Sequence, residues 1–437
     1  MMNRVSRFLF YIGLLLARSY LFPLYFLSGL VRRRPDLWVF GSWGGYRFAD
    51  NAAAFFLHCQ DEIADRVRLV WISRDAAIVA AVRRSGYEAH WLWSPRGIWC
   101  CLRAGLHLFD SFSKDINYWL SRGARKINLW SGVPLKTFER DIRNPGSRYY
   151  RLFHGSLPER WLFGLMMPWH LDRPDLIIAT APEPRDITQR AFDVSAQSVV
   201  VTGFPRNDML FSRAGDTGLL SRQWPQTFRN AVDAGRRVFL YLPTYRDSGK
   251  PFFNVDWAAI DRLMKDLGGT FFFKFHPDDQ GGFQEGLEYV VQLPQGMDIY
   301  TLLAHTDVLI SDYSSIIFDY MLLNRPIIYY VPDLEEFVSS SRSLNFDPVE
   351  IAAGPICSTG DELLRALSEA AAGTGRSTEL EARWSEIRER FNSFADDQSS
   401  RRVLEAIDGR LLDGYLGQAK TAAERSTDEE GPGQIKC

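Results

Sequence analysis

One stretch of the sequence, residues 307–335, constrains the fold more than any other. Its pattern predicts a buried strand at Val308–Ser311, an apolar helix over Ser315–Leu323 and a second buried strand from Pro326 to Val331. Two parallel strands need a crossover connection of a dozen or more residues, which is usually a helix. The strand, helix and strand predicted here fit such a βαβ unit. The chain is therefore predicted to have an α/β fold.

Short buried strands alternate with helices along most of the chain, and the pattern restarts near residues 200–215. The candidate strands are Asp36–Gly41, Arg68–Ser73, Leu106–Asp110, Lys126–Trp130, Leu176–Thr180, Arg237–Leu242, Gly269–Phe275, Tyr289–Leu293, Val308–Ser311 and Ile327–Val331. Repeated alternation is typical of parallel sheets covered by helices. We expect two Rossmann-like domains facing a cleft, with ligands at the carboxyl ends of the strands.

Composition agrees with this organisation and limits the partners. The 437 residues are 46% hydrophobic, which is enough for two cores. A formal net charge of −2 gives no argument for a nucleic-acid partner. The five cysteines show no CxxC spacing, which argues against a disulfide framework or a zinc site and favours a reducing cytoplasm.

The pattern divides the chain into five segments. They are a membrane-associating segment at 1–34, a first α/β domain at 35–200, a second at 201–385, a C-terminal helix at 386–417 and a polar tail at 418–437. The helix belongs to a charged amphipathic stretch, Glu379–Ile407. The composition of the tail predicts disorder.

The N-terminal segment is long, apolar and flanked by arginines. Phe8–Val31 would be long enough to span a bilayer, but Arg18 in its middle costs roughly 2.5–3.5 kcal/mol on insertion, and Pro23 would kink a spanning helix. Two interpretations remain open: a single transmembrane anchor, or helices lying in the interface with arginines on anionic headgroups. Both place the body on the cytoplasmic face of the membrane, and we favour the interfacial form.

Polar residues gather where the expected strands of the second half end. Ser314 and Ser315 fall at a helix start, where free backbone N–H groups favour an anion such as a phosphate. A simpler interpretation, that a serine only caps this helix, is equally open. His276 follows the strand Gly269–Phe275, and Arg246 follows the strand Arg237–Leu242. Arg206 lies shortly before these strands. Together these side chains predict an anion site at one edge of the second sheet.

Several motifs occur in a fixed order. They are Leu129-Trp-Ser-Gly-Val-Pro-Leu-Lys136, Thr202-Gly-Phe-Pro-Arg-Asn-Asp-Met-Leu210, Leu240-Tyr-Leu-Pro-Thr-Tyr-Arg-Asp247, Lys274-Phe-His-Pro277, Asp312-Tyr-Ser-Ser-Ile-Ile-Phe-Asp319 and Tyr330-Val-Pro-Asp-Leu-Glu335, with Phe48-Ala-Asp-Asn51 near the start. This series resembles the CDP-glycerol glycerophosphotransferase family, which includes teichoic acid primases and polymerases and related capsule polymerases. The resemblance runs from about Leu37 to about Ala370. It implies a GT-B-like fold and transfer of a polyol phosphate, most simply glycerol phosphate, from a CDP-activated donor to a lipid-linked acceptor at the membrane surface.

The resemblance and the chemistry of this reaction imply roles for single residues. The expected donor-binding residues, in the second domain, are Arg206, Asn207, Asp208, Thr244, Arg246, Ser314, Ser315 and Asp319. Lys136, in the first domain, is expected to hold the acceptor phosphate, and His276 to act as the general base. Helix-start N–H groups and two serine hydroxyls can stabilise the leaving CMP, and no Asp-x-Asp pair follows a strand. No metal or other cofactor is therefore required.

One position departs from the family pattern. The family motif usually reads Trp-His-Gly-Thr-Pro-Leu-Lys, with the histidine proposed as the catalytic base, whereas this chain has Ser131 there. A serine hydroxyl is far too weakly basic to replace an imidazole near neutral pH. Three explanations remain open. His276 acts alone, another histidine such as His154 or His170 takes the role, or the protein binds its substrates with little turnover.

Two other functions remain open from the sequence. A GT-B glycosyltransferase that uses a nucleotide-sugar donor would share the cleft and the phosphate site, with Glu335 or Glu336 gripping the donor ribose. A non-catalytic scaffold of a surface-polymer assembly complex is suggested by Ser131 alone. The released nucleotide distinguishes a phosphotransferase from a glycosyltransferase. Phosphate transfer releases a nucleoside monophosphate, whereas glycosyl transfer from a UDP-sugar releases UDP.

Overall fold

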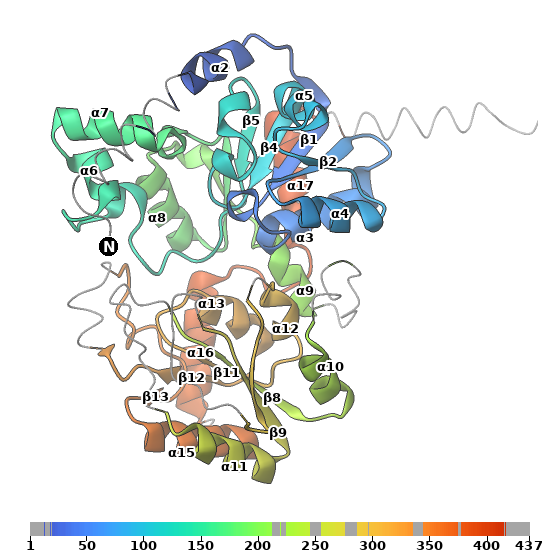
Figure 1. The fold of residues 1–437 in the computed structure, drawn as a ribbon. Coiled ribbons are helices and arrows are strands. Elements are labelled where there is room, and N and C mark those ends of the chain that lie inside the picture. The colour runs from blue at the N-terminus through green and yellow to red at the C-terminus, as the bar shows by residue number, and fades with distance from the viewer. Residues whose placement is uncertain are drawn as a thin grey trace, which may run out of the picture.

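The computed structural model describes residues 20–211, 224–244, 255–275, 286–295, 297–334, 344–374 and 377–414, together with Gly13, Arg18, Leu219 and Leu416. Within these ranges the strands form two parallel sheets, each in its own α/β domain (Figure 1). The prediction of two Rossmann-like domains is therefore confirmed.

In the described part of the chain the first sheet has seven parallel strands, ordered β3-β2-β1-β4-β5-β6-β7. They are β1 (Arg34–Gly41), β2 (Arg68–Ser73), β3 (Ala89–Trp91), β4 (Ala104–Phe109), β5 (Arg125–Asn128), β6 (Leu176–Ala179) and β7 (Val199–Val201). The helices of this domain are α3 (Asp50–Ile63), α4 (Ala76–Arg84), α5 (Pro95–Arg103), α6 (Arg148–His154), α7 (Leu157–Met166) and α8 (Pro182–Phe192). The strand order reverses between β1 and β4, and ligands of open α/β sheets bind at such a switch point.

The described residues of the second sheet form six parallel strands, ordered β10-β9-β8-β11-β12-β13. They are β8 (Arg237–Leu242), β9 (Gly269–Phe273), β10 (Val290–Gln292), β11 (Val308–Ser311), β12 (Ile327–Tyr330) and β13 (Ile356–Cys357). Its helices are α9 (Asp208–Phe211), α10 (Gln226–Asp233), α11 (Trp257–Leu267), α12 (Tyr300–Leu303), α13 (Ile316–Tyr320) and α15 (Gly360–Ala372). Here the order reverses between β8 and β11, the strands that precede two of the polar motifs.

Burial explains which strands the sequence reveals. Every residue of β4, β9, β11 and β12 is buried, because helices cover both faces of a parallel sheet. These strands appear in the sequence as continuous apolar runs. Strands β3, β7 and β13 lie at sheet edges and have only two or three residues each, too few to give a pattern.

The expected single helix over 386–417 is wrong. Helix α16 (Thr378–Phe391) ends early, and α17 (Ser399–Leu411) begins after a non-helical link. The link breaks the helix because it bonds to both domains: Asn392 Nδ2 donates to Phe318 O at 2.9 Å, and Ser393 N donates to Thr180 O at 2.9 Å. Helix α17 then returns to the first domain, beside α3 (Figure 1).

The two chain segments that pass between the domains are bound to each other. The carboxylate of Asp208 accepts hydrogen bonds from the backbone N–H groups of Ser399 and Ser400 at 2.9 and 2.8 Å. A Cβ on Gly203 would lie 2.5 Å from Ser399 Oγ, and its φ of +80° also favours glycine. Because the outward and return segments touch, they act as one connection.

At the N-terminus, α2 (Leu21–Ser28) packs on the first domain. The ring of Tyr25 stacks on Tyr118 with centroids 4.6 Å apart, and Phe22 meets Trp119 edge-on. Across the described residues, we find no helix with the length and apolar character needed to cross a bilayer. Most of the predicted apolar segment before Tyr20 lies outside the described residues.

A buried arginine joins the two domains. Arg206 has no exposed surface, and its terminal nitrogens donate to Asp50 Oδ1 at 2.5 Å, to Ser131 O at 2.8 Å and to Asp319 Oδ2 at 2.7 Å. Asp50 begins α3 of the first domain, and Asp319 lies in α13 of the second. Burial alone would lower the pKa of Arg206, but the carboxylates of Asp319 and Asp50 outweigh it and raise that pKa well above its usual value.

Replacing Arg206 with methionine should destabilise the protein by about 3–5 kcal/mol, because two buried carboxylates lose their counter-charge. Urea denaturation measures this change. Arg401→Met is the matched control: Arg401 forms an exposed ion pair with Glu405 on α17, and its loss should change stability by less than about 0.5 kcal/mol. Equal effects of the two substitutions would contradict a linking role for Arg206.

Candidate active site

The second sheet brings polar groups together at its switch point. The backbone N–H of Thr244, just after β8, donates to both carboxylate oxygens of Asp312, just after β11, at 2.9 and 3.0 Å. Lys274 follows the neighbouring strand β9, and burial, assisted by the charge of Arg47, lowers its pKa to about 8. The strand ends therefore converge as the sequence predicts.

Ser314 and Ser315 lie at this edge, at the start of α13. Ser315 makes no side-chain capping bond, and Ser314 Oγ is 3.5 Å from Ile316 N, at the limit of a hydrogen bond. The bond to Ser314 Oγ is of the N-cap type, so the interpretation of a serine that only caps this helix stays open. The helix is only five residues long, so its dipole is small.

A loop of the first domain lies directly against Ser315. A Cβ on Gly132 would be 2.5 Å from Ser315 Oγ and 3.2 Å from its Cβ, so any larger residue here would force Ser315 to move. Asn51, on α3, holds the loop by donating to the carbonyls of Leu129 and Trp130 at 3.0 and 2.7 Å. The half-buried Ser131 is thus brought beside the serine pair of the second domain.

The same loop also contacts the second domain further along. Asn345 donates from its backbone N–H to Leu135 O at 2.8 Å and from its side chain to Pro134 O at 2.7 Å. Lys136 forms an antiparallel bridge with Leu344 and is half-buried. The loop from Ser131 to Lys136 therefore follows the boundary between the domains.

Four of the expected donor-binding residues have structural partners instead. Arg206 and Asp319 have no exposed surface, and Asn207 Nδ2 donates to Asp319 Oδ1 at 2.8 Å. Asp208 caps the start of α17, and burial raises its pKa. Asp208 remains half-buried, whereas the other three side chains are buried. In this structure the four residues bond to other parts of the protein, and their contacts with a donor remain a prediction.

The histidines considered as replacement bases lie in different surroundings. His170 is buried, with Nδ1 2.8 Å from Glu139 Oε1 and its ring against Phe112, surroundings that favour a structural role. His154 is exposed, and its Nε2 donates to Arg140 O at 2.7 Å. His276 and Arg246 lie outside the described residues, as do Glu335 and Glu336.

Two buried acids of the domain junction, Asp298 and Asp50, were not predicted from the sequence as site residues. Asp298 accepts from the N–H groups of Asp50 and Tyr300 at 2.9 and 3.0 Å, and burial raises its pKa. Tyr300 donates its hydroxyl to Asp319 at 2.9 Å, and its ring lies 4.0 Å from the guanidinium of Arg206. The motif Phe48-Ala-Asp-Asn51 was the available signal for Asp50 and Asn51.

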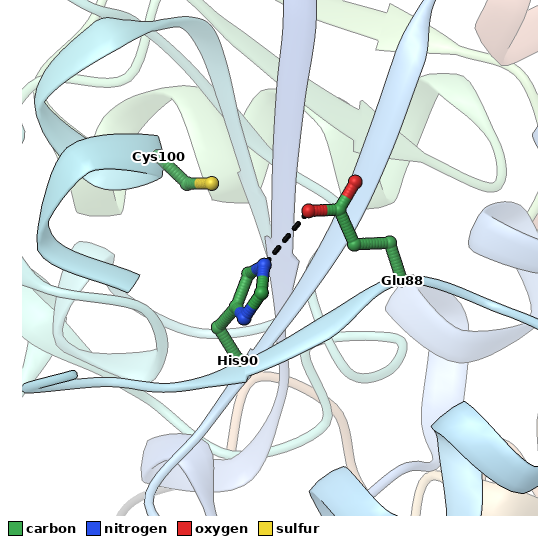
Figure 2. Close-up of side chains that lie close together, drawn as sticks. All are labelled: Glu88, His90 and Cys100. Carbon is green, nitrogen blue, oxygen red and sulfur yellow. Dashed lines mark hydrogen bonds and ion pairs between the residues drawn. The ribbon is translucent and has the colours of Figure 1, made fainter. Parts of the chain in front are cut away.

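Among the described residues, Glu88, His90 and Cys100 place their ligand-type atoms within 4.8 Å of one another (Figure 2). Two positively charged arginines beside these residues make the binding of a metal cation unfavourable. Arg68 donates to both oxygens of Glu88 at 2.8 and 2.7 Å, and Arg83 lies 2.9 Å from His90 Nδ1. Because an arginine can only donate, Nδ1 accepts, and Nε2–H donates to Glu88 at 2.7 Å. A metal would have to displace this proton beside two guanidiniums, so the residues fit a structural network better.

Comparison with known sequences gives the family. The profile of CDP-Glycerol:Poly(glycerophosphate) glycerophosphotransferase matches residues 24–409. The teichoic acid glycerol-phosphate transferase of Staphylococcus aureus (strain NCTC 8325 / PS 47) is 26% identical over 387 residues, which cover 85% of this chain and 92% of that protein. The teichoic acid poly(glycerol phosphate) polymerase of Bacillus spizizenii is 24% identical over 417 residues, 88% and 94% of the two chains. The teichoic acid ribitol-phosphate primase of the same species is 24% identical over 400 residues, 89% and 95%.

Solved structures agree on the fold. A structure of the wall teichoic acid polymerase TagF superposes with a TM-score of 0.70 at 20% identity, covering 96% of this chain and 99% of that one. A TagF variant soaked with CDPG gives 0.69 at 20% identity, covering 96% and 100%. The two parallel sheets thus have the GT-B-like arrangement of TagF. The profile match covers most of the sequence, and the chain therefore belongs to the CDP-glycerol:poly(glycerophosphate) glycerophosphotransferase family.

Proposed function

We propose that this protein transfers a polyol phosphate, which we take to be glycerol phosphate, from a CDP-activated donor to a lipid-linked acceptor in the synthesis of a teichoic acid-like or capsule polymer. The observation that carries the proposal is the contact between Gly132 and Ser315, which brings a motif of each domain to one place at the switch point of the second sheet. Family membership supports the reaction class.

The motifs of the sequence and the chemistry of phosphate transfer suggest how the reaction proceeds. The hydroxyls of Ser314 and Ser315 bind the donor diphosphate, with Arg246 as a further phosphate ligand. An acceptor hydroxyl attacks the β-phosphorus, the bond from that phosphorus to the bridging oxygen breaks, and CMP leaves with the oxygen. His276 takes the proton of the attacking hydroxyl. Lys136 holds an acceptor phosphate at the loop, and this reaction scheme does not require a metal ion.

Incubation of the purified full chain with CDP-glycerol and a lipid-linked acceptor tests the function. We expect CMP to appear only when the acceptor is present, because the base needs the acceptor hydroxyl. Release of UDP from a UDP-sugar would instead support a glycosyltransferase. Binding of CDP-glycerol without any release of CMP would support a scaffold.

Ser131 gives a second test. Ser131→His restores the residue usual in the family, and we expect kcat to rise by up to about 10²-fold, within the range of general base catalysis. Ser131→Asn is the control, because it adds similar bulk without a base. An unchanged kcat in the histidine variant would show that proton transfer in this chain does not depend on position 131.

We also propose that the protein acts at the cytoplasmic membrane surface through α2 and α7. Their outer faces expose large apolar side chains: Phe26 on α2 is 56% exposed and Trp161 on α7 is 69% exposed. The guanidinium of Arg122 lies 4.5 Å from the ring of Phe26, and Arg160 lines the pocket between the two helices. Apolar side chains beside basic ones suit the interface of an anionic bilayer.

Trp161→Ser should weaken binding to vesicles that contain anionic phospholipid by about tenfold, the effect of no longer burying one large apolar side chain. Vesicle co-sedimentation measures the change. Trp99→Ser is the matched control, since Trp99 is also partly exposed but lies on α5 at another part of the domain. Equal losses for the two variants would contradict docking through α7.

A further inference from the structure

A second polar pocket lies beside the end of the loop that carries Ser131 and Lys136. Its volume is about 480 Å³, and one of the residues that line it is Thr137, which follows Lys136 in the chain. The charged and polar side chains that define it are Arg140, Arg143, Arg190, Asp141, His154 and Asn345. This basic pocket has no role in the donor site described above.

The charges of the basic pocket do not balance. Three guanidiniums face one carboxylate within it, and that carboxylate, Asp141, is already paired with Arg190 at 2.8 Å. The nearest carboxylate to Arg140 is that of Asp193, at 3.7 Å. Arg143 is exposed, and it makes no hydrogen bond or ion pair with any residue that the structure describes. The basic pocket therefore carries positive charge that is available to an anionic ligand.

Both domains form the basic pocket. Its arginines come from the 3-10 turn Glu139–Asp141, the segment after it and α8, whereas Asn345 belongs to the second domain. The loop from Ser131 to Thr137 leads from the candidate active site to the basic pocket. Six residues span at most about 20 Å when fully extended. One extended molecule can thus reach from Ser131 into the basic pocket.

Guanidinium groups select the chemistry of the ligand. Arginine matches the paired oxygens of a phosphate and binds them bidentately, and it keeps its charge at any physiological pH. The donor diphosphate is already accommodated at Ser314 and Ser315. We propose that the basic pocket binds a phosphodiester group of the acceptor, set back from the hydroxyl that reacts. This inference rests on the proposed function, because only a phosphate-bearing acceptor would place such a group there.

Arg143→Gln in the full chain tests the proposal. We expect the KM for a glycerol phosphate oligomer used as acceptor to rise about tenfold, the effect of losing one charged hydrogen bond. The KM for CDP-glycerol and kcat should stay unchanged, because the donor binds elsewhere. Arg84→Gln is the matched control, since Arg84 is an exposed arginine on α4, outside the basic pocket.

Calorimetric binding of a short synthetic glycerol phosphate oligomer gives a readout that needs no turnover. A roughly tenfold weaker affinity in Arg143→Gln supports the proposal, even where the unmodified chain releases no CMP and the proposed function fails. Unchanged oligomer affinity and unchanged acceptor KM would overturn it. So would a loss confined to anionic vesicles with oligomer binding retained, because the basic pocket would then take a lipid headgroup.

Discussion

The burial of one guanidinium between two carboxylates determines how the domains of this protein meet. Moving Arg206 out of water costs several kcal/mol, and the attraction of Asp50 and Asp319 offsets that cost only when both are in place. Asp50 belongs to the first domain and Asp319 to the second, so Arg206 contacts both carboxylates only when the domains are arranged as observed. The same guanidinium holds Ser131 O, which connects the domain arrangement to the position of the loop at the candidate active site.

The sequence predicts the buried parts of this fold well and its edges poorly. Strands such as β8 and β11 appear as continuous apolar runs because both faces are covered, and their observed bounds equal the predicted ones. The edge strand β13 exists because two of its residues pair with β12, and no local pattern records such a pairing. The break between α16 and α17 has the same origin, since contacts with both domains end a helix that the local sequence would continue.

The candidate site shows a similar division. The order of the motifs predicts that Thr244, Asp312 and the serine pair meet, because strand order and polarity place them at one sheet edge. The sequence does not distinguish a charge that faces a ligand from one that is paired inside the protein. Arg206 and Asp319 are separated by 113 positions in the chain, and their hydrogen bond appears only in the folded structure.

The double passage of the chain between the domains limits how the cleft can move. The outward segment at Gly203 and the return segment at Ser399 are in contact, and Asp208 fastens them with two hydrogen bonds. Because the two crossings are bonded to each other, the chain connects the domains at one place rather than two. Opening the domains about this place would separate Asp50 from Asp319, the two carboxylates that share Arg206.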